Sequence, residues 1–83
     1  MSSAFESISL DKLAPGKNGT VLSFTDDRLV TNRLASLGFT PGVAVDMTQN
    51  YGHGPLIVTV RGTRVALGRG DAAKIFVQRG RNE

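Results

Sequence analysis

The sequence predicts a small, mainly β domain in which about five short antiparallel strands form a strongly bent sheet or barrel beside one short helix. Three observations lead to this fold class. The chain has 83 residues, of which 40% are hydrophobic, so it suits one domain with one modest core. Apolar and polar residues alternate with a period of two through much of its second half, between glycine-containing turns. One stretch before Gly38 has helical spacing instead.

The first quarter of the chain predicts a flexible N-terminus over residues 1–7 and the start of a domain that covers residues 8–78. Asp11 favours a single helical turn. The segment 19–24 is rich in strand-forming residues and predicts the first strand. The first apolar anchors of the domain are Ile8, Leu10 and Leu13.

The predicted helix begins at Asp26 or Asp27, because aspartate caps a helix N-terminus and its charge suits the positive end of the helix dipole. Val30, Leu34 and Leu37 follow at i, i+4 and i+7. This spacing places all three on one face, which predicts the buried side of the helix.

The helix is predicted to end at Gly38, which can adopt the left-handed conformation that closes a helix. In such an ending Phe39 packs back against the last turn, near Leu34. Pro41 and Gly42 then fit a type II turn, because proline presets the first turn angle and glycine supplies the positive φ of the second. A strand is expected directly afterwards.

Two β-rich runs, 56–60 and 63–67, are joined by Arg61 and Gly62 and predict a β-hairpin with a two-residue turn. In this register the apolar residues share one face and the polar residues the other. The predicted pairs are Val60 with Thr63, Thr59 with Arg64, Val58 with Val65, and Leu56 with Leu67. The other expected segments are a strand at 43–48, a loop at 50–55, a break at 68–70, a short turn capped by Asp71, a strand at 75–77 and a flexible tail at 79–83.

The residue types that catalysis and metal binding require are scarce in this chain. It has no cysteine and a single histidine, His53, so we expect no metal site and no cofactor. A loose iron or nickel contact between His53 and an acidic residue stays open as an alternative, although a solvated loop histidine is the favoured interpretation. No serine accompanies a base in a recognisable pattern, and Gly68 to Asp71 lacks the lysine of a phosphate loop, so we expect no enzyme and no small-molecule substrate. The short apolar runs and the absence of cysteine predict a cytoplasmic protein without direct membrane insertion.

The net charge of +3 leaves an alternative open, a small basic barrel that binds single-stranded nucleic acid. Arg61, Arg64 and Arg69 could contact phosphates. Base stacking would need exposed aromatic residues, and only Tyr51 is expected to be one. Phe39 belongs to the predicted core, so nucleic acid is the less favoured partner.

Taken in order, these motifs resemble the FeoA family. The resemblance rests on five motifs in order: Arg-Leu-x-x-Leu-Gly-Phe-x-Pro-Gly at 33–42, a Gly-Pro loop, the hairpin, Ala-Leu-Gly-Arg, and Ala-x-x-Ile-x-Val at 72–77. The chain departs from the family pattern at Asn32, where a second basic residue is common, and at Tyr51, where a proline is common. The resemblance implies an SH3-like barrel. It also implies an accessory protein of bacterial ferrous iron uptake that acts beside FeoB, a membrane permease with a GTPase domain.

The resemblance therefore predicts protein–protein docking on the cytosolic part of a FeoB-like permease. An apolar spot beside Arg33, formed by Val30 or Leu34, would suit such a contact, although Leu34 fits the core equally well. An arginine that reaches into the partner's GTP site is a further possibility. The residues expected to contribute to docking are Arg33, Leu34, Tyr51, Arg61 and Arg64.

Overall fold

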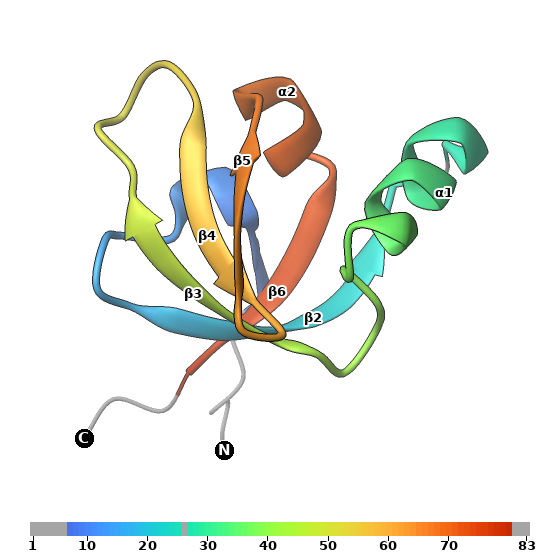
Figure 1. Ribbon diagram of the computed structural model, residues 1–83, viewed down its shortest axis with the longest axis horizontal. Coiled ribbons are helices and arrows are strands. Elements are labelled where there is room, and N and C mark those ends of the chain that lie inside the picture. Colours follow the sequence, from blue (N-terminus) through green and yellow to red (C-terminus); the bar gives the residue numbers. More distant parts are fainter. Residues whose placement is uncertain (1–6, 26, 81–83) are drawn as a thin grey trace.

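The computed structural model describes residues 7–25 and 27–80, and Figure 1 shows a strongly bent antiparallel sheet with short helical segments around it. The sheet has six strands in the order β1-β6-β2-β3-β4-β5. The strands are β1 (Ser7–Ser9), β2 (Asn18–Phe24), β3 (Ala44–Gln49), β4 (Leu56–Val60), β5 (Thr63–Leu67) and β6 (Ile75–Arg79). The helical segments are the 3-10 turn η1 (Leu10–Lys12), α1 (Arg28–Ser36) and α2 (Arg69–Ala72).

The mainly β prediction is confirmed, and the first and last strands extend one residue beyond the range 8–78 expected for the domain. Ser7, expected in the flexible N-terminus, begins β1 and pairs with Gln78. Arg79, expected in the tail, ends β6 and pairs with Gly19. Strand β1 was not predicted, because three residues are too short to show a periodic pattern and the strand exists by pairing with β6. The rest of the two predicted termini, residues 1–6 and 81–83, lies outside the described residues.

Strand β2 is where the sheet bends most visibly toward the helix (Figure 1). Its pairing with β6 shifts register between Val21 and Ser23, which leaves Leu22 as the extra residue of a bulge. Val21 is buried in the core, whereas Leu22 is exposed on the other side. A bulge increases local twist, so it turns the end of β2 away from the sheet and toward the start of α1.

Helix α1 begins as predicted at Asp27, whose Oδ1 accepts a hydrogen bond of 3.3 Å from the Val30 N–H. The other predicted cap, Asp26, lies outside the described residues. Val30 and Leu34 are buried, which confirms the prediction for two of the three residues expected on the buried face of the helix. Leu37 contradicts the prediction, because 42% of it is exposed. The chain turns back directly after Leu37, so the following apolar residue takes the buried place at this end of the helix.

That following residue is Phe39, and its position confirms the predicted helix ending. The Phe39 N–H donates to the Leu34 carbonyl at 3.0 Å, and the Gly38 N–H donates to the Ala35 carbonyl at 3.0 Å. These are the two bonds of a Schellman ending. Gly38 has φ +106°, and Gly42 in the next turn has φ +91°, so both glycines adopt the left-handed backbone that the sequence predicted.

The β4–β5 hairpin has the predicted register, with five consecutive pairs from Leu56↔Leu67 to Val60↔Thr63. Its two turn residues, Arg61 and Gly62, have φ 53° and 79°. Positive φ at both positions defines a type I′ turn, whose twist matches that of the flanking strands. Arg61 is the one residue other than glycine with positive φ in the described part of the chain.

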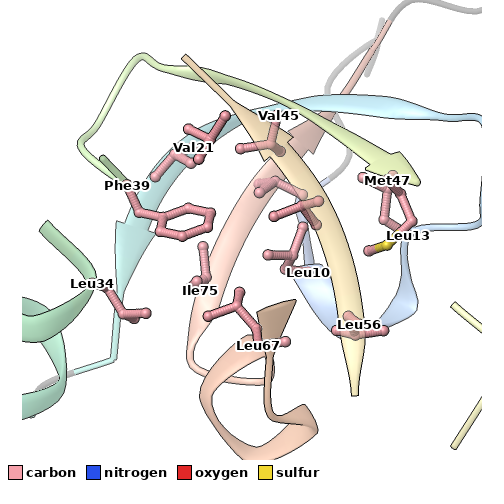
Figure 2. Packing of buried hydrophobic residues seen from close by; sticks show 14 of the residues in the cluster. Leu10, Leu13, Val21, Leu34, Phe39, Val45, Met47, Leu56, Leu67 and Ile75 are labelled. Carbon is pink, nitrogen blue, oxygen red and sulfur yellow. The ribbon is translucent and has the colours of Figure 1, made fainter. Parts of the chain in front are cut away.

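The core is a single cluster of apolar side chains inside the bend of the sheet, and Figure 2 shows Leu34, Phe39, Ile75 and Leu67 pointing toward one another at its α1 side. Helix α1 therefore attaches to the sheet through its inner face. The buried members are Leu10, Leu13, Val21, Val30, Leu34, Phe39, Val45, Met47, Leu56, Val58, Val60, Leu67, Ala72, Ile75 and Val77.

Candidate docking surface

Two apolar side chains at α1, those of Leu29 and Leu37, are exposed to solvent and do not pack in the core. Leu29 is 81% exposed and Leu37 is 42% exposed. Arg33 is spaced four residues from each of them, so the three side chains follow one another along the helix. We call Leu29, Arg33 and Leu37 the outer face of α1. The sequence suggested an apolar spot beside Arg33 formed by Val30 or Leu34, but both of these are buried, and the exposed apolar side chains beside Arg33 are those of Leu29 and Leu37.

Arg33 links α1 to α2 across the fold. Its Nη2 donates to Asp71 Oδ1 at 2.8 Å, with both side chains partly open to solvent. Asp71 was predicted to cap a short turn, and that prediction is wrong: the N-cap of α2 is Gly68, and no side-chain cap bond forms there. The Asp71 carboxylate instead fixes the direction of the Arg33 side chain, and such an exposed pair contributes little to stability.

The tip of the hairpin meets the end of α1. A Cβ placed on Gly38 would lie 3.2 Å from Arg61 Cδ, so the stem of the Arg61 side chain passes directly over this glycine. A larger residue at position 38 would push that side chain away. Leu37, Gly38 and Arg61 therefore join the outer face of α1 to the hairpin tip, and we call the two together the helix end of the molecule.

The five residues predicted for docking are not brought together. Leu34 has no exposed surface, so it belongs to the core and offers nothing to a partner. Arg33 and Arg61 both lie at the helix end. Arg64 is exposed on β5, opposite Thr59. Tyr51 is 72% exposed but precedes β4, whereas Arg61 follows it, so the length of that strand, about 17 Å, separates them.

The loop end of the molecule, where Tyr51 lies, is organised by a polar contact that the sequence analysis missed. Asn50 Nδ2 donates to the carbonyls of Asp11 and Leu13, at 2.9 Å each. Asn50 Oδ1 accepts from Arg69 Nη2 at 2.7 Å and from the Gly52 N–H at 3.0 Å. The spacing of Asn50 and Gly52 in the sequence is the one signal that predicts part of this arrangement, since asparagine commonly bonds the N–H two residues on.

Arg69 was a candidate for phosphate contact, and the structure places it elsewhere. Its Nε donates to the Gly54 carbonyl at 3.2 Å, and its Nη1 donates to the Asp11 carbonyl at 3.3 Å. Together with the bond to Asn50, these contacts engage all three guanidinium nitrogens of the partly buried Arg69 with neighbouring segments of the chain. Arg69 therefore holds the loop end together by hydrogen bonds to three other residues.

Electrostatics at the start of α1 favour an ionised Asp27. The hydrogen bond from the Val30 N–H lowers the pKa of the Asp27 carboxyl below its ordinary value, and Lys74 Nζ, 3.3 Å from Asp27 Oδ2, lowers it further. Lys74 follows α2, so this pair is a second polar link between α1 and the segment before β6.

The described part of the chain brings together no group of three or more histidine, aspartate or glutamate side chains that could hold a metal ion. His53 is exposed on the loop. Among the described aromatic residues, Phe39 is buried and Tyr51 is the one classed as exposed, so they form no row on which bases could stack. None of the helices in residues 7–25 and 27–80 is long and apolar enough to cross a membrane.

The FeoA domain model matches residues 8–79. The chain belongs to the FeoA family. A search of curated proteins returned no match. The family is associated with ferrous iron transport, and its match covers every strand of the sheet apart from the first residue of β1.

Solved structures agree with this assignment. An iron uptake regulatory protein (FeoA) is 29% identical, with a TM-score of 0.86, over 90% of this chain and 100% of the other. FeoA of Stenotrophomonas maltophilia, solved with zinc, is 31% identical over 84% of this chain and 88% of its own, with a TM-score of 0.74. It is described as a prokaryotic SH3 domain protein and a candidate ferrous iron transport activating factor. The predicted SH3-like fold is thereby confirmed.

A third match shows the fold in a different context. A manganese-dependent transcriptional repressor has a TM-score of 0.82 at 21% identity, and the match covers 96% of this chain but 45% of the repressor. At this identity the likeness concerns the fold alone. The same barrel therefore occurs both as a FeoA protein and as one part of a longer protein.

Proposed function

We propose that this FeoA-family chain is a cytoplasmic accessory protein of bacterial ferrous iron transport, which binds the cytosolic part of a FeoB-like GTPase permease and has no catalytic activity of its own. The observation that carries the proposal is the helix end of the molecule. There, two exposed leucines flank Arg33, and the hairpin tip adds Arg61 beside them.

The chemistry of this surface suits a protein partner. Burying a leucine side chain that is now exposed stabilises a complex by about 1.5–3 kcal/mol, and Leu29 has the largest such surface of the exposed leucines. Arg33 between the leucines and Arg61 beside them supply charge and hydrogen-bond donors, and arginine is enriched at protein interfaces. Because Asp71 already orients Arg33, little conformational entropy is lost when that side chain is buried.

Calorimetry of the full chain with the cytosolic domain of a FeoB-like permease tests the proposal in the presence of GDP, of a GTP analogue and of no nucleotide. We expect binding in at least one state. Leu29→Ser is expected to weaken it at least tenfold, which corresponds to the loss of about 1.4 kcal/mol. No heat at high micromolar concentrations in any nucleotide state would contradict the proposed partner.

Tyr51→Ser is the matched control, because it removes an exposed apolar side chain at the loop end. Tyr51 was itself predicted to contribute to docking, so the comparison also decides where docking occurs. Unchanged affinity in Tyr51→Ser together with weaker binding of Leu29→Ser would support a contact that includes the helix end. Loss of affinity in Tyr51→Ser with none in Leu29→Ser would move the contact to the loop end and contradict the location proposed above.

A further inference from the structure

Among the described strands, β5 lies at one edge of the sheet and pairs with β4 alone. The two-residue turn makes Val60 and Thr63 a hydrogen-bonded pair, and such pairs alternate along an antiparallel ladder. The main-chain groups of Thr63, Val65 and Leu67 therefore point toward β4, and those of Arg64 and Ala66 point away from it. No hydrogen bond from elsewhere in the described chain reaches Arg64 or Ala66.

Two devices that usually protect a free strand, a bulge and a proline, are absent from this edge, and the charge of Arg64 is the protection that its side chains supply. Its five pairs with β4 run without a register shift, so no bulge twists it away. It contains no proline. Helix α1 does not cover this edge, because Thr63, Arg64 and Ala66 are all exposed. The helix lies near the hairpin tip and near α2, on either side of the strand in sequence. At the opposite edge, β1 has three residues and offers much less main chain.

The charge beside this edge is positive. The hairpin from 56 to 67 contains Arg61 and Arg64 and no acidic residue. Arg64 pairs with Thr59 on β4, and Thr59 pairs with Asp46 on β3. The Asp46 carboxylate therefore lies two strands away from the edge. The whole chain carries a net charge of +3. An acidic segment would meet favourable charge here, whereas two copies of this edge would bring like charges together.

We propose that β5 binds an extended acidic segment of the partner protein, which adds to the sheet as a further antiparallel strand. The inference rests on the proposed function and names the binding mode of the docking partner. Main-chain hydrogen bonds to Arg64 and Ala66 supply affinity, and alternate side chains supply specificity.

The geometry defines what that segment looks like. Residues opposite Arg64 and Ala66 share their outward face, so an acidic side chain there lies directly across from the Arg64 guanidinium. The intervening residues lie on the face of Val65, which packs against the core, and they favour an apolar side chain. The binding segment therefore alternates acidic and apolar residues over about five positions, the length of β5.

A blocked heptapeptide of alternating glutamate and valine is the probe. Titrated into the 15N-labelled chain, it is expected to shift the amides of Arg64 and Ala66 most and to slow their hydrogen exchange. A lysine–valine peptide of equal length is expected not to bind. If the glutamate–valine peptide leaves both amides unchanged at millimolar concentration, the inference is wrong.

N-methylation of the peptide separates strand addition from simple charge attraction. Methyl groups on the glutamate nitrogens remove the donors that face β5 and are expected to weaken binding about tenfold to a hundredfold, because two hydrogen bonds are lost. Methyl groups on the valine nitrogens, which face away, are expected to change little. Equal weakening by both modifications would contradict strand addition.

Variants of the chain link the edge to the partner. Arg64→Glu is expected to weaken the peptide and the permease domain at least tenfold, whereas Lys12→Glu, an equal charge change at exposed η1, is expected to alter neither. If Arg64→Glu binds the permease domain with unchanged affinity, the partner does not bind at the β5 edge, and the proposed function is unaffected. Peptide binding without permease binding would refute the proposed function alone. A dimer with protected Arg64 and Ala66 amides would assign the edge to a second copy and overturn the inference.

Discussion

The two ends of β4 differ in how they use arginine. At the loop end, the Arg69 guanidinium donates to Gly54, Asp11 and Asn50, so its hydrogen-bonding groups face inward. At the helix end, the stem of Arg61 packs over Gly38, and no hydrogen bond or ion pair within the described chain holds its guanidinium. Arginines of similar sequence context, each beside a glycine, thus serve structure at one end and remain available for binding at the other.

The largest effect is expected at the inner face of α1. Leu34→Ala removes a fully buried side chain from the core and is expected to destabilise the protein by about 2–5 kcal/mol. Urea denaturation, monitored by circular dichroism, measures this change in the free energy of unfolding. A change below about 0.5 kcal/mol, the range typical of surface substitutions, would mean that Leu34 is not in the core and that the two faces of α1 are not distinct.

The loop end is expected to be the next most sensitive. Asn50→Ala removes two donors and the acceptor for Arg69, and its expected cost is about 1–3 kcal/mol. Tyr51→Ser, one residue away but exposed, is expected to cost no more than about 0.5 kcal/mol. Thermal unfolding of both variants compares them, and equal costs would show that the loop end is not held by Asn50.

Gly38→Ala is expected to cost about 1–2 kcal/mol, because a residue with a Cβ is strained at φ +106°. The same Cβ would approach Arg61 Cδ, so the arginine side chain has to move. Denaturation measures the first effect, and the NMR shifts of the Arg61 side chain report the second. If Arg61 does not respond, the helix and the hairpin tip are not in contact in solution.

The smallest effect is expected from the ionisation of Asp27. Its pKa is lower in the folded protein than the ordinary value of 3.8, so its contribution to stability is complete above that value and is lost as the pH falls through the lowered pKa. Melting temperatures of the natural chain and of Asp27→Asn, measured between about pH 5 and pH 2, are expected to converge as the pH falls. A difference in melting temperature that stays constant with pH would show that the charge of Asp27 does not contribute to stability.

The sequence predicted those features whose partners are close together in the chain. The hairpin register follows from 12 consecutive residues, and the ending of α1 depends on two bonds within residues 34–39. Features that join distant segments were missed. The Arg33–Asp71 pair spans 38 positions and the Arg69–Asn50 bond spans 19, and no periodic pattern connects such residues. The exposure of Leu29 depends on how much of α1 the sheet covers, which three-dimensional packing alone decides.

The pairing of β1 with β6 has a consequence for how this barrel is built into other proteins. Ser7 and Gln78 are ladder partners, so the chain enters and leaves the fold at neighbouring positions, with Cα atoms about 5 Å apart. A domain of this kind can be inserted into or appended to another polypeptide as a cassette, since neither junction requires the barrel to open. Its occurrence as 45% of a repressor chain fits that modular architecture.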